Sequence, residues 1–281
     1  MNYLNLLNYG NQILKLEKIP SYRLDSELLL AKVTNKTREE ILTNLNNVIK
    51  PDSISNYQKL LNRRKQNEPI AYIFNQKEFW KYPFLVNKDV LIPRPETEII
   101  VEEVLKLTNY NSSKLFLDVG TGSGCVILSI LKNRPKSKAI AIDISKKALN
   151  IACYNAKMHH LENKINFINI DIDKHKYNKY DYIISNPPYI NSIDLKRLDI
   201  NVRQFEPLIA LSAGIDGLKI IRKLIFRCGK LLKINGKLVF EIGKNQKNNV
   251  VDLLIKNKFY INKICKDINS NPRVIVATKI N

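Results

Sequence analysis

The stretch with the most specific chemistry in this chain is Asn186-Pro187-Pro188-Tyr189. It follows an apolar run, Tyr180–Ser185, whose pattern predicts a strand. The Asn186 side-chain carbonyl and the main-chain carbonyl of Pro187 can accept both hydrogens of a planar NH2 group, while the Tyr189 ring covers the face of that group. Such a site would present a weakly nucleophilic amide or amine nitrogen to an electrophile.

A glycine-rich loop, Asp118–Gly124, precedes this tetrapeptide in the chain. Gly120, Gly122 and Gly124 lie where the backbone must turn sharply and let a ligand approach, with the amides of a helix N-terminus directly after them. The spacing is not that of the dinucleotide fingerprint, and the Gly-Lys-Ser/Thr of a P-loop does not follow. The loop alone therefore indicates only some nucleotide-type ligand.

Two carboxylates follow the next two expected strands. Asp143 lies at the end of one strand, where a carboxylate can hold both ribose hydroxyls. It could equally serve only as a cap for the helix that begins at Ser145. Asp171 lies at the end of the following strand and could accept from an adenine amino group. Taken with the glycine loop, the two acids favour an adenosyl ligand.

The elements that must position these residues alternate regularly. We expect strands at Leu115–Asp118, Ala139–Asp143, Ile165–Ile170, Tyr180–Ser185 and Lys237–Ile242, with helices around Val126–Lys132, Lys146–Met158 and Leu218–Leu232. Such alternation is typical of an α/β domain in which helices cover both faces of a parallel sheet. Phe259–Ile264 and Val274–Thr278 suit an antiparallel pair at the sheet edge.

The first seventy-odd residues read instead as short amphipathic helices. Thr37-Arg38-Glu39-Glu40 is a capping-box pattern, and Pro51 suits a first helical position. The segment that follows suits a hairpin-like connector, with extended Phe79–Val86 and Val90–Ile92 joined by a turn at 87–89. We therefore predict a helical bundle at 1–75, a hairpin linker at 76–92 and a catalytic domain at 93–281.

Composition limits the remaining classes. The chain has 281 residues, four scattered cysteines and no apolar run long enough to span a bilayer. Met1–Leu16 lacks the basic start of a signal peptide, so we expect a cytoplasmic protein with reduced thiols. The three histidines have no metal-ligand spacing, and we expect no metal. The net charge of +20 has two interpretations, either diffuse solvated charge from a coding bias or a useful attraction to an acidic or RNA-rich partner.

Glycine loop, ribose acid and Asn-Pro-Pro-Tyr together resemble class I S-adenosylmethionine-dependent amino-methyltransferases. Over nearly its whole length, the chain resembles the peptide-chain-release-factor glutamine methyltransferase family (HemK/PrmC type). The most specific matching segments are Leu91-Ile92-Pro93-Arg94-Pro95-Glu96-Thr97-Glu98 and Arg203-Gln204-Phe205-Glu206-Pro207; others are Glu68–Ile73, Glu78–Trp80, Ser185–Ile190 and Glu241–Gly243. Two positions depart from the family pattern: Asn75 replaces a glycine, and Ile172 replaces a tryptophan or other large side chain.

The resemblance implies a five-helix N-terminal bundle that recognises substrate, a hairpin linker and a Rossmann-like methyltransferase domain. The implied reaction is N5-methylation of the glutamine amide in the Gly-Gly-Gln motif of class I release factors, with S-adenosylmethionine as methyl donor. The implied cofactor-binding residues are Gly120, Thr121, Gly122, Ser123, Gly124, Asp143, Asp171, Ile172 and Asn186. The implied substrate-binding residues are Asn186, Pro187, Pro188, Tyr189 and Arg94, with Asn186, Pro187 and Tyr189 catalytic. Glu96 and Thr97 would lie beside Arg94 at the entrance.

The chemistry asks for alignment rather than deprotonation. An amide nitrogen is a poor nucleophile, and a sulfonium methyl group is already activated, so no general base is required during transfer. We expect a monomer that binds neither membrane nor nucleic acid directly. Two alternatives remain: an RNA or DNA amino-methyltransferase, whose substrate amines share the NH2 geometry, and a catalytically silent adenosine-binding or ribosome-associated protein.

Overall fold

The structure, a computed structural model, describes residues 1–176 and 179–280. Its contacts divide the chain into two compact units, Met1–Phe74 with Ile200–Phe205, and Asn75–Asp199 with Glu206–Asn281. The first unit is helical: α1 (Tyr3–Leu16), α2 (Tyr22–Thr34), α3 (Arg38–Thr43), α4 (Pro51–Lys65), α5 (Ile70–Phe74) and α9 (Ile200–Phe205). None of the helices in the described part of the chain is long and apolar enough to cross a membrane.

The helical unit is held by an apolar core and by local caps. Tyr57 of α4 is fully buried, and its hydroxyl lies 2.7 Å from the Ser26 hydroxyl of α2. The expected capping box is confirmed, because Thr37 and Glu40 exchange both side-chain bonds at the start of α3. Pro51 occupies the first turn of α4, as predicted.

The hairpin that follows differs from the expected one. It pairs β1 (Gln76–Phe79) with β2 (Tyr82–Leu85) in antiparallel register, and its turn lies at Trp80 and Lys81 rather than at 87–89. The prediction of one extended run over Phe79–Val86 paired with Val90–Ile92 is therefore wrong. Trp80 adopts a φ of 60°, a conformation that a pattern of aromatic residues does not predict.

The α/β unit contains a seven-stranded sheet of order β5-β4-β3-β6-β7-β9-β8. The first five strands in that order are parallel, while β9 is antiparallel to both β7 and β8. The strands are β3 (Leu115–Val119), β4 (Lys138–Asp143), β5 (Ile165–Asn169), β6 (Tyr180–Ser185), β7 (Leu232–Glu241), β8 (Phe259–Lys266) and β9 (Pro272–Lys279). The predicted parallel sheet with an antiparallel pair at one edge is confirmed.

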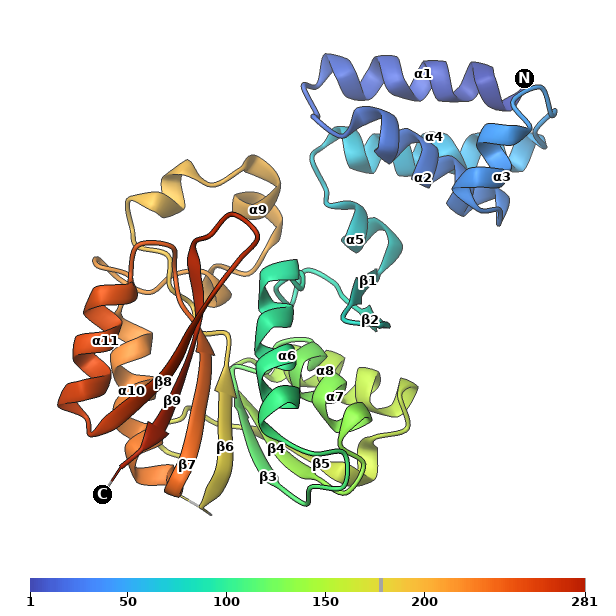
Figure 1. Cartoon of the computed structure of the whole chain (residues 1–281). Coiled ribbons are helices and arrows are strands. Elements are labelled where there is room, and N and C mark those ends of the chain that lie inside the picture. Colours follow the sequence, from blue (N-terminus) through green and yellow to red (C-terminus); the bar gives the residue numbers. More distant parts are fainter. Residues whose placement is uncertain (177–178, 281) are drawn as a thin grey trace. The chain divides into compact units, whose positions relative to one another are not determined.

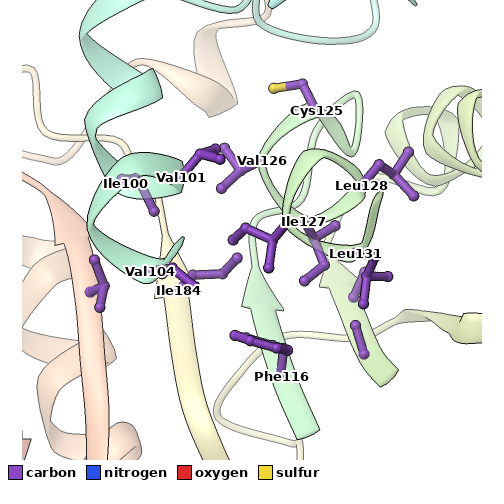
Figure 2. Packing of buried hydrophobic residues seen from close by; sticks show 14 of the residues in the cluster. Ile100, Val101, Val104, Phe116, Cys125, Val126, Ile127, Leu128, Leu131 and Ile184 are labelled. Atoms are coloured by element: carbon purple, nitrogen blue, oxygen red, sulfur yellow. The ribbon is translucent and has the colours of Figure 1, made fainter. Parts of the chain in front are cut away.

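Helices cover both faces of this sheet (Figure 1). They are α6 (Glu98–Leu107), α7 (Cys125–Asn133), α8 (Lys146–Met158), α10 (Lys219–Leu231) and α11 (Lys247–Lys256). On one face, Figure 2 shows side chains of α6 and α7 packed against Phe116 of β3 and Ile184 of β6. On the other, α10 and α11 pack on Leu117 and Ile183, the neighbours of those strand residues. This alternation follows from the two-residue period of a strand.

The strand order reverses between β3 and β6, which lie side by side with Val119 opposite Ser185. In open α/β sheets, ligands bind at this switch point, beyond the carboxyl ends of the strands. The glycine loop leaves β3 here, and the Asn-Pro-Pro-Tyr segment leaves β6 beside it. The sheet therefore brings together two motifs that lie far apart in the sequence.

Candidate functional site

A cavity of about 480 Å³ opens at the carboxyl ends of β3, β4 and β6. The residues expected at the site that line it are Gly120, Thr121, Gly122, Ser123, Asp143, Asp171, Ile172, Asn186, Pro187 and Pro188. Gly124, Arg94 and Tyr189 are not part of this lining. Most of the residues singled out in the sequence are thus gathered at one cavity.

The glycine loop has the backbone that its sequence predicts. Gly120, Gly122 and Gly124 have φ values of 71°, 55° and 80°, in the region that favours glycine. A Cβ at Gly120 or Gly122 would meet nothing within 4 Å, whereas at Gly124 it would approach Leu128 at 3.0 Å. The first two glycines therefore leave space on the cavity side, and Gly124 leaves room for Leu128 and for Ala152 of α8, which a Cβ would approach at 3.3 Å.

Two carboxylates lie beside the loop, Asp118 buried and Asp143 half-buried. Burial raises the pKa of Asp118 to about 7, although a 2.6 Å bond from the Thr121 hydroxyl opposes the shift. Burial also raises the pKa of Asp143, whose oxygens accept from the backbone amides of Gly122 at 3.0 Å and Ser145 at 2.9 Å. Both acids line the cavity and place negative potential there.

Asp143 is not the N-cap residue of α8, although its carboxylate accepts from the amide of that residue, Ser145, at 2.9 Å. The N-cap is Ser145, whose hydroxyl accepts from the amide of Ala148 at 3.1 Å. Asp143 instead ties the end of β4 to the glycine loop, while it still faces the cavity.

Asp171 is held by neighbours that the sequence did not identify. Its Oδ2 accepts from Lys223 Nζ of α10 at 2.7 Å, and its Oδ1 accepts from the Asp173 amide at 2.9 Å. Although partial burial alone would raise the pKa of Asp171, the bond from Lys223 brings it below its usual range. Asp171 is therefore an ionised acceptor, and Lys223 lines the same cavity.

The Asn-Pro-Pro-Tyr segment is anchored by a chain of polar contacts. Asn186 Nδ2 donates to Thr97 Oγ1 at 3.0 Å, and the Thr97 hydroxyl donates to Glu241 Oε2 at 2.6 Å. The Tyr189 hydroxyl donates to the other oxygen of Glu241 at 3.0 Å. Glu241 and Thr97 are 1% and 2% exposed, so these bonds lie out of water.

Tyr189 lies behind the cavity wall. Its ring packs on the apolar cluster beneath α10 and α11. Its carbonyl accepts from Gln246 Nε2 at 3.0 Å, and that amide also bonds the carbonyl of Gly217. At Gly217, which has a φ of 74°, a Cβ would lie 2.6 Å from the Tyr189 carbonyl. The loop therefore depends on a glycine at this position and on Gln246.

Arg94 and Glu206 form an ion pair at the cavity edge. Arg94 Nη2 lies 2.5 Å from Glu206 Oε1, and the Ile92 amide donates to Glu206 Oε2 at 3.1 Å. The Glu206 side chain is 1% exposed. The segment after it, residues 207–210, lines the cavity. Arg94, expected to contact substrate, thus also joins two loops that border the site.

Sequence reasoning missed the roles of Glu241, Gln246 and Lys223. Glu241 carried a signal, since an acid at the carboxyl end of a parallel strand, here β7, lies at the edge of the sheet where ligands bind. At Asn75, by contrast, the departure from the family pattern has no structural consequence. The residue departs from the family's glycine, but its φ of 53° is one that asparagine tolerates.

Comparisons with known proteins agree with this architecture. The family model for the PrmC N-terminal domain matches residues 5–74, and the one for the methyltransferase small domain matches 96–203. The chain is 38% identical to the release factor glutamine methyltransferase of Buchnera aphidicola, over 99% of this chain and all of that protein. It is 37% identical to the bifunctional methyltransferase of Rickettsia typhi over 98% of this chain and 57% of that protein.

The chain thus spans about half the length of the bifunctional relatives it matches. Among solved structures, the M. jannaschii tRNA m1G37 methyltransferase aligns with a TM-score of 0.51 and 19% identity, over 73% of this chain and 56% of that one. At this identity the likeness concerns the fold alone, which is that of a class I methyltransferase.

Proposed function

The chain belongs to the release factor glutamine methyltransferase family, and on that premise we propose that it methylates a release factor. The reaction is N5-methylation of the glutamine side chain in the Gly-Gly-Gln motif of class I factors. S-adenosylmethionine is the methyl donor. The observation that supports this most is the convergence of the glycine loop and Asn186-Pro187 on one cavity, from adjacent strands.

The cavity suits an adenosyl sulfonium ligand. Gly120 and Gly122 leave open space where side chains would block it, and Asp118 and Asp143 offer negative charge to a cation. Asp143 is the acceptor proposed for the ribose hydroxyls, and Asp171 with Ile172 borders the proposed adenine position. When bound, S-adenosylmethionine supplies a methyl group already activated by its positively charged sulfur.

The substrate side of the site needs hydrogen-bond acceptors for the glutamine amide. A primary amide presents two N–H donors, and Asn186 Oδ1 with the Pro187 carbonyl can accept both. These two acceptors orient the amide nitrogen and stabilise the positive charge that develops on it during transfer. The N–C bond would form as the bond between the sulfonium sulfur and the methyl carbon breaks, with neutral S-adenosylhomocysteine as the leaving group, and the methylated nitrogen would then lose one proton to solvent. Asn186 and Pro187 are thus the proposed catalytic residues, with Tyr189 behind them.

The remaining assignments belong to the same proposal. The bundle (1–75) recognises the protein substrate, the linker (76–92) joins it to the catalytic domain (93–281), and the enzyme acts as a cytoplasmic monomer. What supports the first of these is the match of residues 5–74 to the family model for the PrmC N-terminal domain. The described cysteines are all free.

The direct test is incubation of the purified chain with labelled S-adenosylmethionine and either an intact release factor or ribosomal RNA. We expect label in the factor, on the glutamine of its Gly-Gly-Gln motif, and none when that residue is alanine. Transfer to the RNA but not to the factor would favour the nucleic-acid alternative. Cofactor binding without transfer to either would favour the silent binding protein.

A further inference from the structure

Four side chains form a continuous hydrogen-bonded relay that begins at the cavity wall, which Asn186 and Thr97 line, and extends behind it to Glu241 and Tyr189. Asn186 and Tyr189 come from the loop after β6, Thr97 ends the short helix η1 (Pro95–Thr97), and Glu241 ends β7. The bonds run from Asn186 to Thr97 at 3.0 Å, from Thr97 to Glu241 at 2.6 Å, and from Tyr189 to Glu241 at 3.0 Å. Thr97 and Glu241 are almost wholly buried, so water does not replace these bonds.

The chemistry of the relay sets its direction. An ionised carboxylate only accepts, so Glu241 takes the single hydroxyl proton of Thr97. With its proton given away, the Thr97 oxygen can only accept from its other neighbour. That neighbour must therefore be the NH2 end of the Asn186 amide, because the carbonyl end would place two acceptors face to face. Asn186 Oδ1 is then left for the cavity, which Asn186 lines.

We propose that Glu241 and Thr97 are positioning residues that fix the Asn186 amide with its oxygen toward the substrate. The inference rests on the proposed function, since that orientation matters only if the group bound there is an NH2 donor. Asparagine alone could turn either end toward the cavity. The relay selects the end that accepts from glutamine and rejects the end that would accommodate a glutamate carboxylate.

The second oxygen of Glu241 helps to fix the backbone of the loop after β6. It holds the Tyr189 hydroxyl, while Gln246 holds the Tyr189 carbonyl at 3.0 Å. One buried carboxylate thus holds both ends of the tetrapeptide, Tyr189 directly and Asn186 through the Thr97 hydroxyl. Pro187, whose carbonyl is the second proposed acceptor, lies between them.

The relay also depends on the charge of Glu241. Burial raises the pKa of this carboxyl, whereas the bonds from Thr97 and Tyr189 and the charge of Arg273 on β9 oppose the shift; Glu96 on η1 reinforces it. A protonated Glu241 could donate to Thr97, which would let the hydroxyl turn its proton to Asn186 and reverse the amide. Because the pKa is raised, the correct orientation is complete at high pH and is lost as pH falls through that value.

The test compares two substitutions of one hydroxyl in the full-length enzyme. Thr97→Val keeps the shape but removes the relay, and we expect kcat to fall by about tenfold to a hundredfold, the range for losing one buried hydrogen bond. Thr97→Ser keeps the hydroxyl and should stay within a few-fold of the unsubstituted enzyme. Thr108→Val removes another buried hydroxyl, at the C-cap of α6 and thus at the opposite end of that helix from Thr97, and controls for general destabilisation.

A binding measurement tests whether Thr97 orients the Asn186 amide or only supports the fold around it. With S-adenosylhomocysteine present, calorimetry gives the affinity for a release factor carrying Gly-Gly-Gln and for one carrying Gly-Gly-Glu. The unsubstituted enzyme and Thr97→Ser should prefer glutamine, whereas Thr97→Val should lose most of that preference because Asn186 can turn. In Glu241→Gln, the acid limb of the kcat pH profile should also disappear.

Each outcome has a distinct meaning. If the unsubstituted enzyme does not methylate the factor, the proposed function fails. If it does, but Thr97→Val keeps both its rate and its preference for glutamine, the inference fails alone. An equal loss in Thr97→Val, Thr97→Ser and Thr108→Val would also overturn it, because hydroxyl chemistry at Thr97 would then be irrelevant.

Discussion

Cofactor affinity should depend on Asp143. Its carboxylate lines the cavity and accepts from the amides of Gly122 at 3.0 Å and Ser145 at 2.9 Å, so its oxygens are fixed in place before any ligand arrives. Removing a charged acceptor of this kind costs about 1.5–3 kcal/mol. Since each ~1.4 kcal/mol is a factor of ten, Asp143→Ala should bind S-adenosylmethionine about tenfold to a hundredfold more weakly.

Titration calorimetry of the purified variant measures this change directly. Asp252→Ala is the matched control, because that acid is exposed on α11 and does not line the cavity. Its affinity should equal that of the unsubstituted chain. A thermal unfolding scan of each variant confirms that the sheet is intact.

The refuting result is an unchanged affinity in a folded Asp143→Ala variant. The bonds that Asp143 accepts from Gly122 and Ser145 would then be its whole contribution, as a tie from the end of β4 to the glycine loop and to the start of α8. A loss of folding would appear in the thermal scan rather than be read as a loss of affinity.

Asn186→Ala should leave cofactor affinity within a few-fold but slow single-turnover methyl transfer by about a hundredfold or more, because a preorganised acceptor of developing charge is lost; an unchanged rate would contradict the amide clamp. Glu206→Gln should weaken the ion pair with Arg94. In steady-state kinetics, KM for the release factor should then rise more than KM for S-adenosylmethionine. An equal rise in the two KM values would count against a role of this pair at the substrate side. Removing residues 1–74 should preserve cofactor affinity while slowing methylation of an intact factor, measured by label incorporation, and full activity would leave the bundle a structural role. Because the pKa of Asp118 is raised to about 7, this group lowers the free energy of unfolding as pH rises from about 4 to 7. The free energy of unfolding of Asp118→Asn, measured with urea, should therefore increase relative to that of the unsubstituted protein between pH 5 and pH 8. A difference between the two proteins that stays constant with pH would refute the raised pKa.

Local patterns in the sequence were enough to predict most of the catalytic fold. Strand Tyr180–Ser185 and helix Lys146–Met158 have the predicted bounds, because apolar periodicity reports directly on burial. The glycine loop was equally readable, since its positive φ values require the residue type that marks it. The hairpin was not, because its turn is made at Trp80, which carries no turn signal and has a φ of 60°.

The sequence by itself determined which chemical groups follow which strand: the glycine loop after β3, Asp143 after β4 and Asn186 after β6. Only the tertiary structure decided which other side chains bond to these groups. Thr97 and Glu241 are 144 positions apart, and Thr97 and Asn186 are 89 apart, yet each pair shares a hydrogen bond. Such contacts depend on which strands become neighbours and on where the short helix η1 lies relative to the carboxyl ends of those strands. No local periodicity encodes that arrangement, since it is set by the packing of the whole domain.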